Sequence, residues 1–468
     1  MKTRLVSSFA LVGVLAACAD IGTINKVSAP RAGLDAVTNR TQQAQAGTPA
    51  WHLNASEINA AESKALSMIQ GKTVSSDTAV QVALLNNRGL QASYSDLGLS
   101  AADVWETAIG PVPSIGVSIT GLAGDVTRTL EAALITALVE AATVKPRTKV
   151  AELRFEQAQL AAAGDTIALA VETRRAWIEA VAAFETTALI ARTQNAADAA
   201  SELATELGRT GALGVADQAR EHAFNAELAA ELADARLEAE LAKGRLARLM
   251  GVSLGQARFY VPDALPGLPG QPRSSPDIER LALQNRVDLA AGRLELEAIA
   301  AEYRLTGQTR VFSDLEIALG AEIERDSGDT SVVPVIDFEI PLYDSSKLIS
   351  RRGSLAYLKA ANLLAEAAVG ARTEARAAHM AVTGKHSVAR HWRDTVLPLR
   401  RTIDEEALKS YNGMITSTFE LLEDARDGLE AELGAAEAKR DYWLAETAVT
   451  AAIWGGSAST GGKEGDDE

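Results

Sequence analysis

Residues 147–207 contain no proline and a single glycine, Gly164, which predicts one very long helix. At about 1.5 Å per residue, a continuous helix of this length would span roughly 90 Å. The range 347–409 has a similar length but contains glycines and Pro398, which should kink the helix because proline lacks an amide donor. Helices this long cannot bury their surface in one compact core. They must pack lengthwise, within the chain and between chains.

Each long helix is followed by a glycine-containing turn, at 208–211 and 412–413, and by a return helix, at about 216–250 and 417–454. The two turns therefore lie together at one far end of the helices.

Four segments alternate between apolar and polar residues, the pattern of a strand between an apolar medium and water. They are about 9–11 residues long at their clearest, which is the length that a membrane strand needs. The second segment is the weakest, because Leu130, Leu134 and Leu138 fit a helix equally well, and it is assigned by symmetry with the second half. A soluble β-sandwich layer over a core is the alternative. The predicted strands are 113–122, 130–144, 311–324 and 332–343.

Four strands cannot close a membrane barrel, and open sheet edges are not tolerated in lipid. If these strands lie in a membrane, several chains must share one barrel, and three copies would supply twelve strands. The strand pattern therefore predicts an oligomer.

The second half of the chain repeats the plan of the first at an offset of 199 residues, so that Asn86 meets Asn285 and Leu90 meets Leu289. Each copy opens at a polar helix cap, Ser76-Asp77 or Ser275-Pro276-Asp277. The predicted organisation is an N-terminal linker or equatorial segment (18–74), a first repeat (75–261), a Pro/Gly linker (262–276), a second repeat (277–454) and a disordered acidic tail (455–468).

The first residues resemble a bacterial lipoprotein signal. Lys2 and Arg4 precede a short apolar run that ends in Leu15-Ala16-Ala17-Cys18, and Cys18 is the only cysteine. This pattern predicts a signal peptide at 1–17 and lipidation of Cys18; an ordinary signal cut after Ala19 is the alternative. A lone cysteine excludes an internal disulfide framework.

Composition argues against several other classes of protein. The formal charge of −16 is unsuited to nucleic acid, whose phosphates need a basic surface. The sequence contains no P-loop, nucleophile elbow or dinucleotide fingerprint. His379 and His386 share a helix face and could bind a metal with a nearby acid, but polar helix surface is the simpler interpretation. We therefore predict no catalytic residue, no metal and no cofactor, and a protein that is not an enzyme.

Three motifs resemble the TolC-type outer-membrane efflux protein family, in its lipoprotein branch. They are Leu-Ala-Leu-Gln-Asn-Arg-Val-Asp-Leu at 281–289, Ile340-Pro341-Leu342-Tyr343-Asp344, and the Pro398…Tyr411…Gly413…Leu421-Leu422 helix pair. The resemblance covers about 75–455, although the first repeat lacks a clear Pro-Leu-Tyr-Asp strand end.

The resemblance implies a mainly α fold: a homotrimer that shares a twelve-strand outer-membrane β-barrel and a long periplasmic α-barrel. It implies a protein of the outer membrane, lipid-anchored through Cys18, with most of its chain in the periplasm. It also implies partners, namely a periplasmic adaptor protein and an inner-membrane transporter that lead to this exit channel. The candidate adaptor-docking residues are Gly208, Gly211, Asn412, Gly413 and Thr416; ordinary helix-turn chemistry explains the glycines equally well.

A pore rather than bond chemistry is then the expected mechanism. Acidic residues on the polar strand face would appear in every copy, and ringed carboxylates favour cations. The alternative is that some of them, Glu324 in particular, lie in extracellular loops. The predicted lumen acids are Glu316, Glu322, Glu324, Asp337 and Glu339.

Three other functions are compatible with parts of this pattern. The duct of a type I protein secretion system would look the same, because the pump chooses the substrate. A periplasmic adaptor would show one helical hairpin rather than two. A structural coiled-coil lipoprotein would lack the alternating strands.

Overall fold

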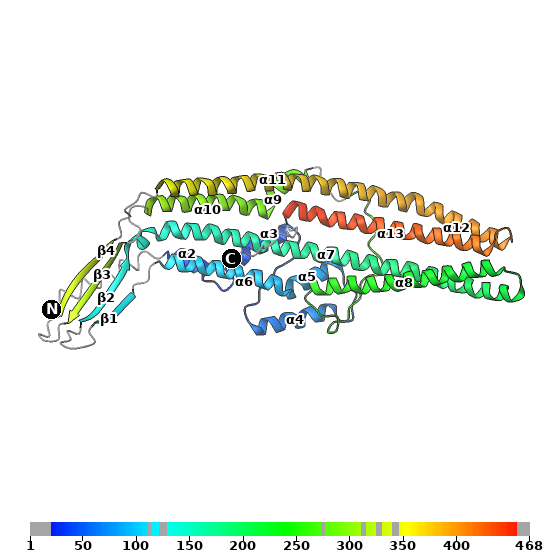
Figure 1. Ribbon diagram of the computed structural model, residues 1–468, viewed down its shortest axis with the longest axis horizontal. Coiled ribbons are helices and arrows are strands. Elements are labelled where there is room, and N and C mark those ends of the chain that lie inside the picture. The colour runs from blue at the N-terminus through cyan, green and yellow to red at the C-terminus, as the bar shows by residue number, and fades with distance from the viewer. Residues whose placement is uncertain are drawn as a thin grey trace. The chain divides into compact units, whose positions relative to one another are not determined.

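The computed structural model describes residues 20–110, 114–120, 129–272, 277–309, 315–323, 330–338 and 346–455, which are mainly helical (Figure 1). The elements are, in chain order, α2 (Ile21–Val27), α3 (Leu34–Gln43), α4 (Ala55–Ile69), α5 (Ser76–Asn86), α6 (Arg88–Ile109), β1 (Ser114–Thr120), β2 (Thr129–Ala137), α7 (Leu138–Thr210), α8 (Val215–Leu249), α9 (Ile278–Asn285), α10 (Val287–Thr309), β3 (Leu315–Ile323), β4 (Thr330–Phe338), α11 (Ser346–His391), the π-helix η1 (Trp392–Val396), α12 (Leu397–Asn412) and α13 (Thr418–Trp454).

The chain divides into two compact units. Unit 1 comprises Met1–Val37, Ser93–Ala162 and Asp288–Ala367, and unit 2 comprises Thr38–Ala92, Ala163–Val287 and Ala368–Glu468. The long helices α7 and α11 contribute residues to both.

In unit 1, α6 packs against α7, and α7 against α10. A side chain at Gly110, the residue after α6, would meet Val144 of α7, so glycine permits a close approach there. Farther along α7, Arg154 Nη2 lies 2.8 Å from Glu302 Oε2 of α10.

The next contact in unit 1 joins α10 to α11. Leu364 of α11 packs over Gly292 of α10, and the Tyr303 ring of α10 packs over Gly353 of α11. The helices of unit 1 therefore follow one another in the order α6, α7, α10, α11, as Figure 1 shows. In this series α6 and α11 are the outer members.

The strands of unit 1 form one antiparallel sheet in the order β1-β2-β3-β4. This is also the order of the helices to which they connect, because α6 leads to β1, β2 to α7, α10 to β3 and β4 to α11. The outer strands β1 and β4 are thus the neighbours in sequence of the outer helices α6 and α11.

The second predicted strand, 130–144, is wrong in its second half. Strand β2 ends at Ala137, and α7 begins at Leu138 and passes through Pro146. The buried side chain of Val144, packed at Gly110, stabilises the early start and offsets the backbone hydrogen bond that Pro146 cannot make. Strands β1 and β3 lie inside the predicted ranges, whereas β4 begins at Thr330, two residues before the predicted start.

The range 18–74 is more ordered than a linker, since it contains α2, α3 and α4. The Asp20 side chain caps α2 by accepting a hydrogen bond from the Thr23 amide. The Asp20 amide in turn donates to the Ala108 carbonyl at the end of α6, at 3.2 Å. In unit 1 the first described residue of the chain is therefore fixed next to the end of α6.

The core of unit 2 joins α4, α5, the middle of α7 and the segment after α8. The indole Nε1 of Trp177 donates to the Val74 carbonyl at 2.8 Å. Next to it, Thr73 forms a parallel bridge with Tyr260. These contacts hold the segment after α8 against the helices, and part of it is the predicted Pro/Gly linker.

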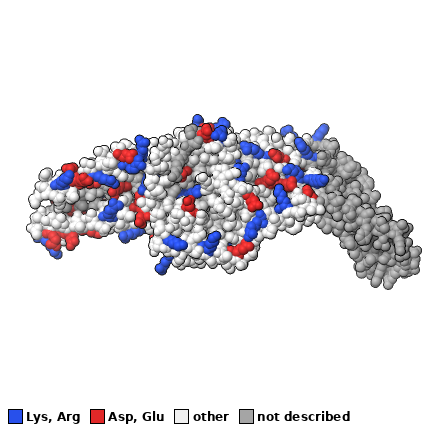
Figure 2. Space-filling model, turned by 180° about the vertical axis from the view of Figure 1, so that it is seen from behind, with Lys and Arg blue, Asp and Glu red and all other residues white. Residues whose placement is uncertain are grey.

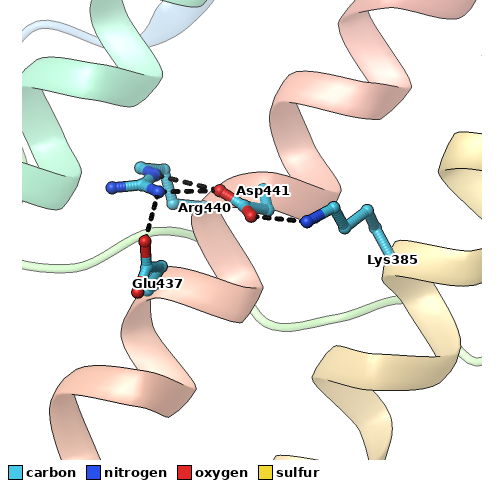
Figure 3. A network of polar contacts seen from close by, with 4 residues as sticks. All are labelled: Lys385, Glu437, Arg440 and Asp441. Atoms are coloured by element: carbon cyan, nitrogen blue, oxygen red, sulfur yellow. Dashed lines mark hydrogen bonds and ion pairs between the residues drawn. The ribbon is translucent and has the colours of Figure 1, made fainter.

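A charged network connects α11 to α13 in unit 2 (Figure 3). Asp441 accepts hydrogen bonds from Lys385 Nζ and Arg440 Nη2, each at 2.8 Å, and Arg440 also donates to Glu437 at 2.9 Å. Burial alone would raise the pKa of Asp441, but the hydrogen bonds from Lys385 and Arg440 outweigh it and hold that pKa below its usual range.

The predicted interruption at Pro398 takes the form of a short π-helix directly before it. The Leu397 amide donates to the Trp392 carbonyl, five residues earlier, and α12 then resumes with Pro398 in its first turn. The wider π turn accommodates Pro398, which has no amide to donate to the carbonyls of the preceding turn.

The helix caps differ in detail from the prediction. Ser75 rather than Ser76 caps α5, accepting from the Thr78 amide. Asp277 precedes α9 without a side-chain cap hydrogen bond. The order of elements α5-α6-β1-β2-α7-α8 in the first half matches α9-α10-β3-β4-α11-α13 in the second half. The interpretation of the two halves as copies of one repeat stays a prediction.

A substitution at Gly251 tests the packing of unit 2. Gly251 has φ +68°, and an added Cβ would lie 2.7 Å from the Asn86 carbonyl oxygen. Gly251→Ala should lower stability by more than the ~1–2 kcal/mol that a left-handed backbone alone costs, and thermal unfolding in detergent measures it. Gly244→Ala, in the interior of α8 with ordinary contacts, is the control and should stabilise by about 0.5–1 kcal/mol. Equal melting of Gly251→Ala and the parent protein would contradict this account.

Candidate functional site

The register of the four strands separates their residues into two faces. Residues at alternate positions of a strand share a face, and directly paired residues of neighbouring strands lie on the same face. Ile115 pairs with Leu134, Leu134 with Leu319, and Leu319 with Pro334, so these positions lie on one face of all four strands. The positions of this apolar face are Ile115, Val117, Ile119, Leu130, Ala132, Leu134, Thr136, Leu315, Ile317, Leu319, Ala321, Ile323, Thr330, Val332, Pro334, Ile336 and Phe338.

The opposite face carries all the charged positions of the described strands. Glu316 pairs directly with Asp337 across β3 and β4, and Glu322 pairs with Ser331 on the same face. Two other predicted lumen acids, Glu324 and Glu339, lie outside the described residues. The register thus brings three of the five predicted acids to one face.

A further acid on that face, Glu131, pairs with Ser118 and was missed by the sequence reasoning. The alternation in residues 129–137 would have identified it, had the segment not also fitted a helix. No lysine or arginine occurs in the four described strands, so this face is acidic wherever it is charged.

The first turn, between α7 and α8, begins at Gly211, and Gly208 lies in the last turn of α7. Gly211 has φ +74°, which favours glycine, and its amide donates to the Gly208 carbonyl. A side chain at Gly208 would collide with Gln218 of α8. The turn itself therefore explains Gly211, whereas Gly208 leaves room for the amide end of the Gln218 side chain.

The second turn joins α12, which ends at Asn412, to α13. Ser417 and Glu420 form a reciprocal capping box at the start of α13. Thr416 Oγ1 is buried without a hydrogen-bond partner among the described residues. Gly413 lies next to Met414, which has φ +56° and is 94% exposed.

Exposed apolar side chains mark both turns. Val215 begins α8, and Met414 and Ile415 lie in the second turn. The sequence reasoning selected the glycines and polar residues of the turns and missed these three. Nothing in the local pattern identified them, because their exposure follows from the helices ending there. Exposed apolar residues of this kind mark a contact site when they lie together.

A buried carboxylate lies close to the first turn. Glu221 of α8 is only 3% exposed, and its Oε2 has no hydrogen-bond partner among the described residues. The adjacent His222 ring is engaged by the Ser201 hydroxyl at 2.6 Å. Burial raises the pKa of Glu221, the nearby charge of Asp217 raises it further, and His222 lowers it.

The two histidines considered for a metal both lie on α11, and His379 is partly exposed. His386 is buried, with Nε2 2.8 Å from the Pro269 carbonyl oxygen and its ring edge-to-face with Tyr442. The interpretation of His386 as polar helix surface is therefore wrong, because the segment after α8 covers it. In the described ranges, no group of three or more His, Cys, Asp or Glu is arranged to hold a metal ion.

Helices that could cross a membrane are absent from the described part of the chain, where none has both the length and the apolar character required. Cys18 lies outside the described residues.

Several solved structures share this architecture. The Campylobacter jejuni CmeC outer membrane channel aligns with a TM-score of 0.67 and 17% identity, over 81% of this chain and 86% of that one. The outer membrane protein VceC from Vibrio cholerae aligns with a TM-score of 0.66 and 15% identity, over 81% and 96%. The Neisseria gonorrhoeae MtrE outer membrane channel aligns at 0.59 and 16%, over 81% and 89%.

The chain has the fold of these outer-membrane channels. The resemblance drawn from the sequence is thus confirmed at the level of the fold. No family model matches the sequence, and no protein of curated function matches it. The structure therefore identifies the fold of this chain. The activity of the chain is a separate question, because the sequence identities are only 15–17%.

The Glu221 carboxyl gives this fold a pH dependence that can be measured. Because its pKa is raised in the folded state, the unfolded chain loses the proton first, and stability falls as pH rises from the ordinary glutamate range through the folded pKa. Glu221→Gln should remove this fall. Hydrogen exchange of the α7–α8 hairpin at several pH values, corrected for intrinsic rates, measures it.

Glu227→Gln is the matched control, an exposed acid on the same helix, and should leave the pH dependence unchanged. Identical pH profiles for Glu221→Gln and the parent protein would show that the buried carboxyl does not titrate as argued.

Proposed function

We propose that this protein is the outer-membrane channel of a tripartite efflux system, which gives substrates from an inner-membrane pump and a periplasmic adaptor a passive exit. The observation that carries the proposal is the two-faced sheet of β1–β4 on a scaffold with the fold of outer-membrane channels. One face is mainly apolar in every strand and the other carries all the charged positions beside Ile135, Val333 and Val335, as expected for a wall between lipid and water.

The edges of this sheet require more than one chain. Strands β1 and β4 are its outer members, and in lipid each would leave a row of backbone groups without a partner. A neighbouring copy covers the β1 edge if its β4 pairs with β1, and a closed ring of copies covers every edge. Three copies supply twelve strands, which exceeds the smallest membrane barrels of about eight. We therefore propose a homotrimer with a shared barrel.

The position of Asp20 supports a lipid anchor at Cys18. Asp20 is held by the Ala108 carbonyl at the end of α6, the helix that leads into β1, and Cys18 is two residues away, within about 8 Å of extended chain. A diacylated Cys18 in such a position would reach the leaflet that the strands enter. Signal cleavage before Cys18 and outer-membrane location belong to the same proposal.

The exposed residues of the two turns suit a docking surface. Val215, Met414 and Ile415 present apolar groups beside the candidates Gly208, Gly211, Asn412, Gly413 and Thr416. We propose that an adaptor protein contacts these side chains. The glycines then act by shaping the turns, and the exposed apolar groups supply the contact area.

Transport through such a duct needs no bond chemistry in this chain. Glu131, Glu316, Glu322 and Asp337 would recur in each copy and make the lumen negative. The channel would then favour cations, and the pump would decide which substrate enters.

Ion selectivity in a planar bilayer tests the channel and the role of its acids together. The parent protein should conduct with a preference for K⁺ over Cl⁻, read from the reversal potential in a KCl gradient. Glu316→Gln combined with Asp337→Asn should move this preference toward equal permeability, because two ringed carboxylates are neutralised.

Glu231→Gln combined with Asp263→Asn, exposed acids of unit 2, provides the control with the same loss of charge. A protein that forms no conducting pores would contradict the channel itself. Unchanged selectivity in the first double variant would remove only the lumen role of these acids.

The anchor is tested separately by the intact mass of protein extracted from outer membranes. The parent should begin at Cys18 and carry acyl mass, whereas Cys18→Ser should carry none because serine offers no thiol for the lipid. Persistence of lipid on the Cys18→Ser variant, or its absence from the parent, would end the lipoprotein proposal.

A further inference from the structure

A cavity of about 540 Å³ in unit 1 is lined by α6, α7 and α10, and its walls carry charges of both signs. This volume falls within the roughly 300–1,000 Å³ that is usual for sites that hold small molecules. The proposed passage of substrates makes no use of this cavity. Its charged residues are Asp103 and Glu106 from α6, Arg147 and Arg154 from α7, and Glu302 from α10.

The packing of α6 on α7 places these charges on opposite walls. The two helices run in opposite chain directions, because α6 leads into β1 and α7 follows β2, and they approach closely where Gly110 meets Val144. Asp103 and Ala151 are each seven residues from this contact, so they lie opposite each other. Ala151 is itself about one helical turn from each arginine of the cavity. The acidic wall of α6 therefore faces a small residue that has a guanidinium on either side.

The two acids of α6 do not pair with these arginines. Arg154 contacts Glu302 instead, with Nη2 2.8 Å from Oε2. Among the residues that the structure describes, no ion pair includes Asp103 or Glu106. The Thr107 hydroxyl donates to the backbone carbonyl of Asp103, at 2.8 Å, rather than to its carboxylate. Opposite charges thus line the same cavity and are held apart across it.

The charges of the cavity select a ligand that carries both signs. On the face that Figure 2 shows, basic and acidic side chains are interspersed, so the local arrangement within the cavity has to provide any selectivity. A bare anion would be repelled by the three carboxylates of the cavity, and a bare cation by its two guanidiniums. A zwitterion is attracted to both walls.

The side chains also specify the two charged groups of such a zwitterion. The planar guanidinium fork of arginine matches the oxygens of a phosphate. A primary ammonium has three donors, which carboxylates accept. In an α-amino acid a single carbon separates the two charged groups, which is short for helices whose axes lie about 8–10 Å apart. Phosphoethanolamine separates its charges by an ester oxygen and two carbons, and so it reaches both walls.

We propose that this cavity binds a phosphoethanolamine group, with its phosphate at Arg147 and Arg154 and its ammonium at Asp103 and Glu106. Arg154 keeps its contact with Glu302 in this arrangement, because a guanidinium has five N–H donors. The ligand satisfies both walls at once, which neither a free phosphate nor a free amine does.

Two sources can supply this group. One is the headgroup of phosphatidylethanolamine, because Gly110 of the cavity lies four residues before the start of β1, within about 14 Å of extended chain. Trp105 and Ile109 are exposed on the same part of α6, and tryptophan is enriched where membrane meets water. The lipid source rests on the proposed function, since it requires the sheet to lie in the membrane. The other source is a soluble phosphodiester, which needs no membrane.

Calorimetric titration of the full-length protein in detergent tests the recognition. The probe is glycerophosphoethanolamine, the headgroup without its acyl chains, and we expect it to bind. Glycerophosphoglycerol has the phosphodiester but no ammonium, and glycine has too short a charge separation, so each should bind at least about tenfold more weakly. Equal affinity for the three compounds, or no binding of glycerophosphoethanolamine, overturns the proposal.

The arginine wall is tested by Arg147→Gln. This variant should bind glycerophosphoethanolamine about tenfold more weakly, because a charge-assisted hydrogen bond to the phosphate is lost. Arg304→Gln, at an exposed base on α10 of unit 1, is the matched control and should bind as the parent protein does. Equal affinity of Arg147→Gln and the parent protein contradicts the proposed position of the phosphate.

The acidic wall is tested by a change of preference. Asp103→Asn combined with Glu106→Gln should bind glycerophosphoglycerol more tightly than the parent protein does, because two repulsive charges are removed, and misfolding cannot produce such a gain. Glu297→Gln combined with Glu366→Gln, at exposed acids of unit 1, should keep the preference of the parent protein. An unchanged preference in the first double variant contradicts the role of the acidic wall.

Native mass spectrometry distinguishes the two sources. The full-length protein is mixed in detergent with phosphatidylethanolamine and phosphatidylglycerol that have the same acyl chains. If Arg147→Gln lowers the retention of phosphatidylethanolamine, the lipid is the source; if retention is unchanged while binding of the soluble headgroup is lost, the source is soluble. A protein that conducts in a planar bilayer but binds no headgroup loses this site alone. A protein that binds the headgroup but forms no pores loses the channel and keeps the site.

Discussion

Each outer strand of the β1–β4 sheet exposes one row of backbone amides and carbonyls, and the rest of the structure can be understood from this constraint. In water such edges are hydrated, but next to lipid they must find partners. The register makes one face of every strand mainly apolar, which suits the sheet to lipid. The outer edges of β1 and β4 still need hydrogen-bond partners. A ring of copies removes the edges without adding strands to the chain.

The helices of unit 1 follow the same order as the strands to which they connect. In unit 1 they follow the sequence α6, α7, α10, α11, and glycines such as Gly110, Gly292 and Gly353 allow close approach between neighbours. Alanine recurs among the buried positions of both units, so long helices pack at short range through small side chains. Specific polar contacts then fix the neighbours, as Lys385 and Asp441 do between α11 and α13 in unit 2.

The local sequence predicted those helices and strands whose residue pattern fits only one kind of secondary structure. Strict alternation identified β3 and β4, the scarcity of proline and glycine in 147–207 identified most of α7, and the Asn412-Gly413 pair marked the second turn. The boundary between β2 and α7 could not be predicted, because Leu130, Leu134 and Leu138 fit a helix as well as a strand. The contact of Val144 with Gly110, which is distant in sequence, decides where the helix begins. The burial of His386 depends on a segment more than a hundred residues away. For the site, three acids were brought to one face as expected, while the exposed apolar residues of the turns follow only from where the helices end.

The central claim is that one chain supplies a third of a closed wall. Native mass spectrometry of the protein extracted from outer membranes in detergent tests this claim most directly. The account predicts a complex of three chains, with neither a monomer nor a dimer as the main species. A monomer that remains folded in detergent would contradict the shared sheet, because its β1 and β4 edges would then be stable without a neighbouring copy.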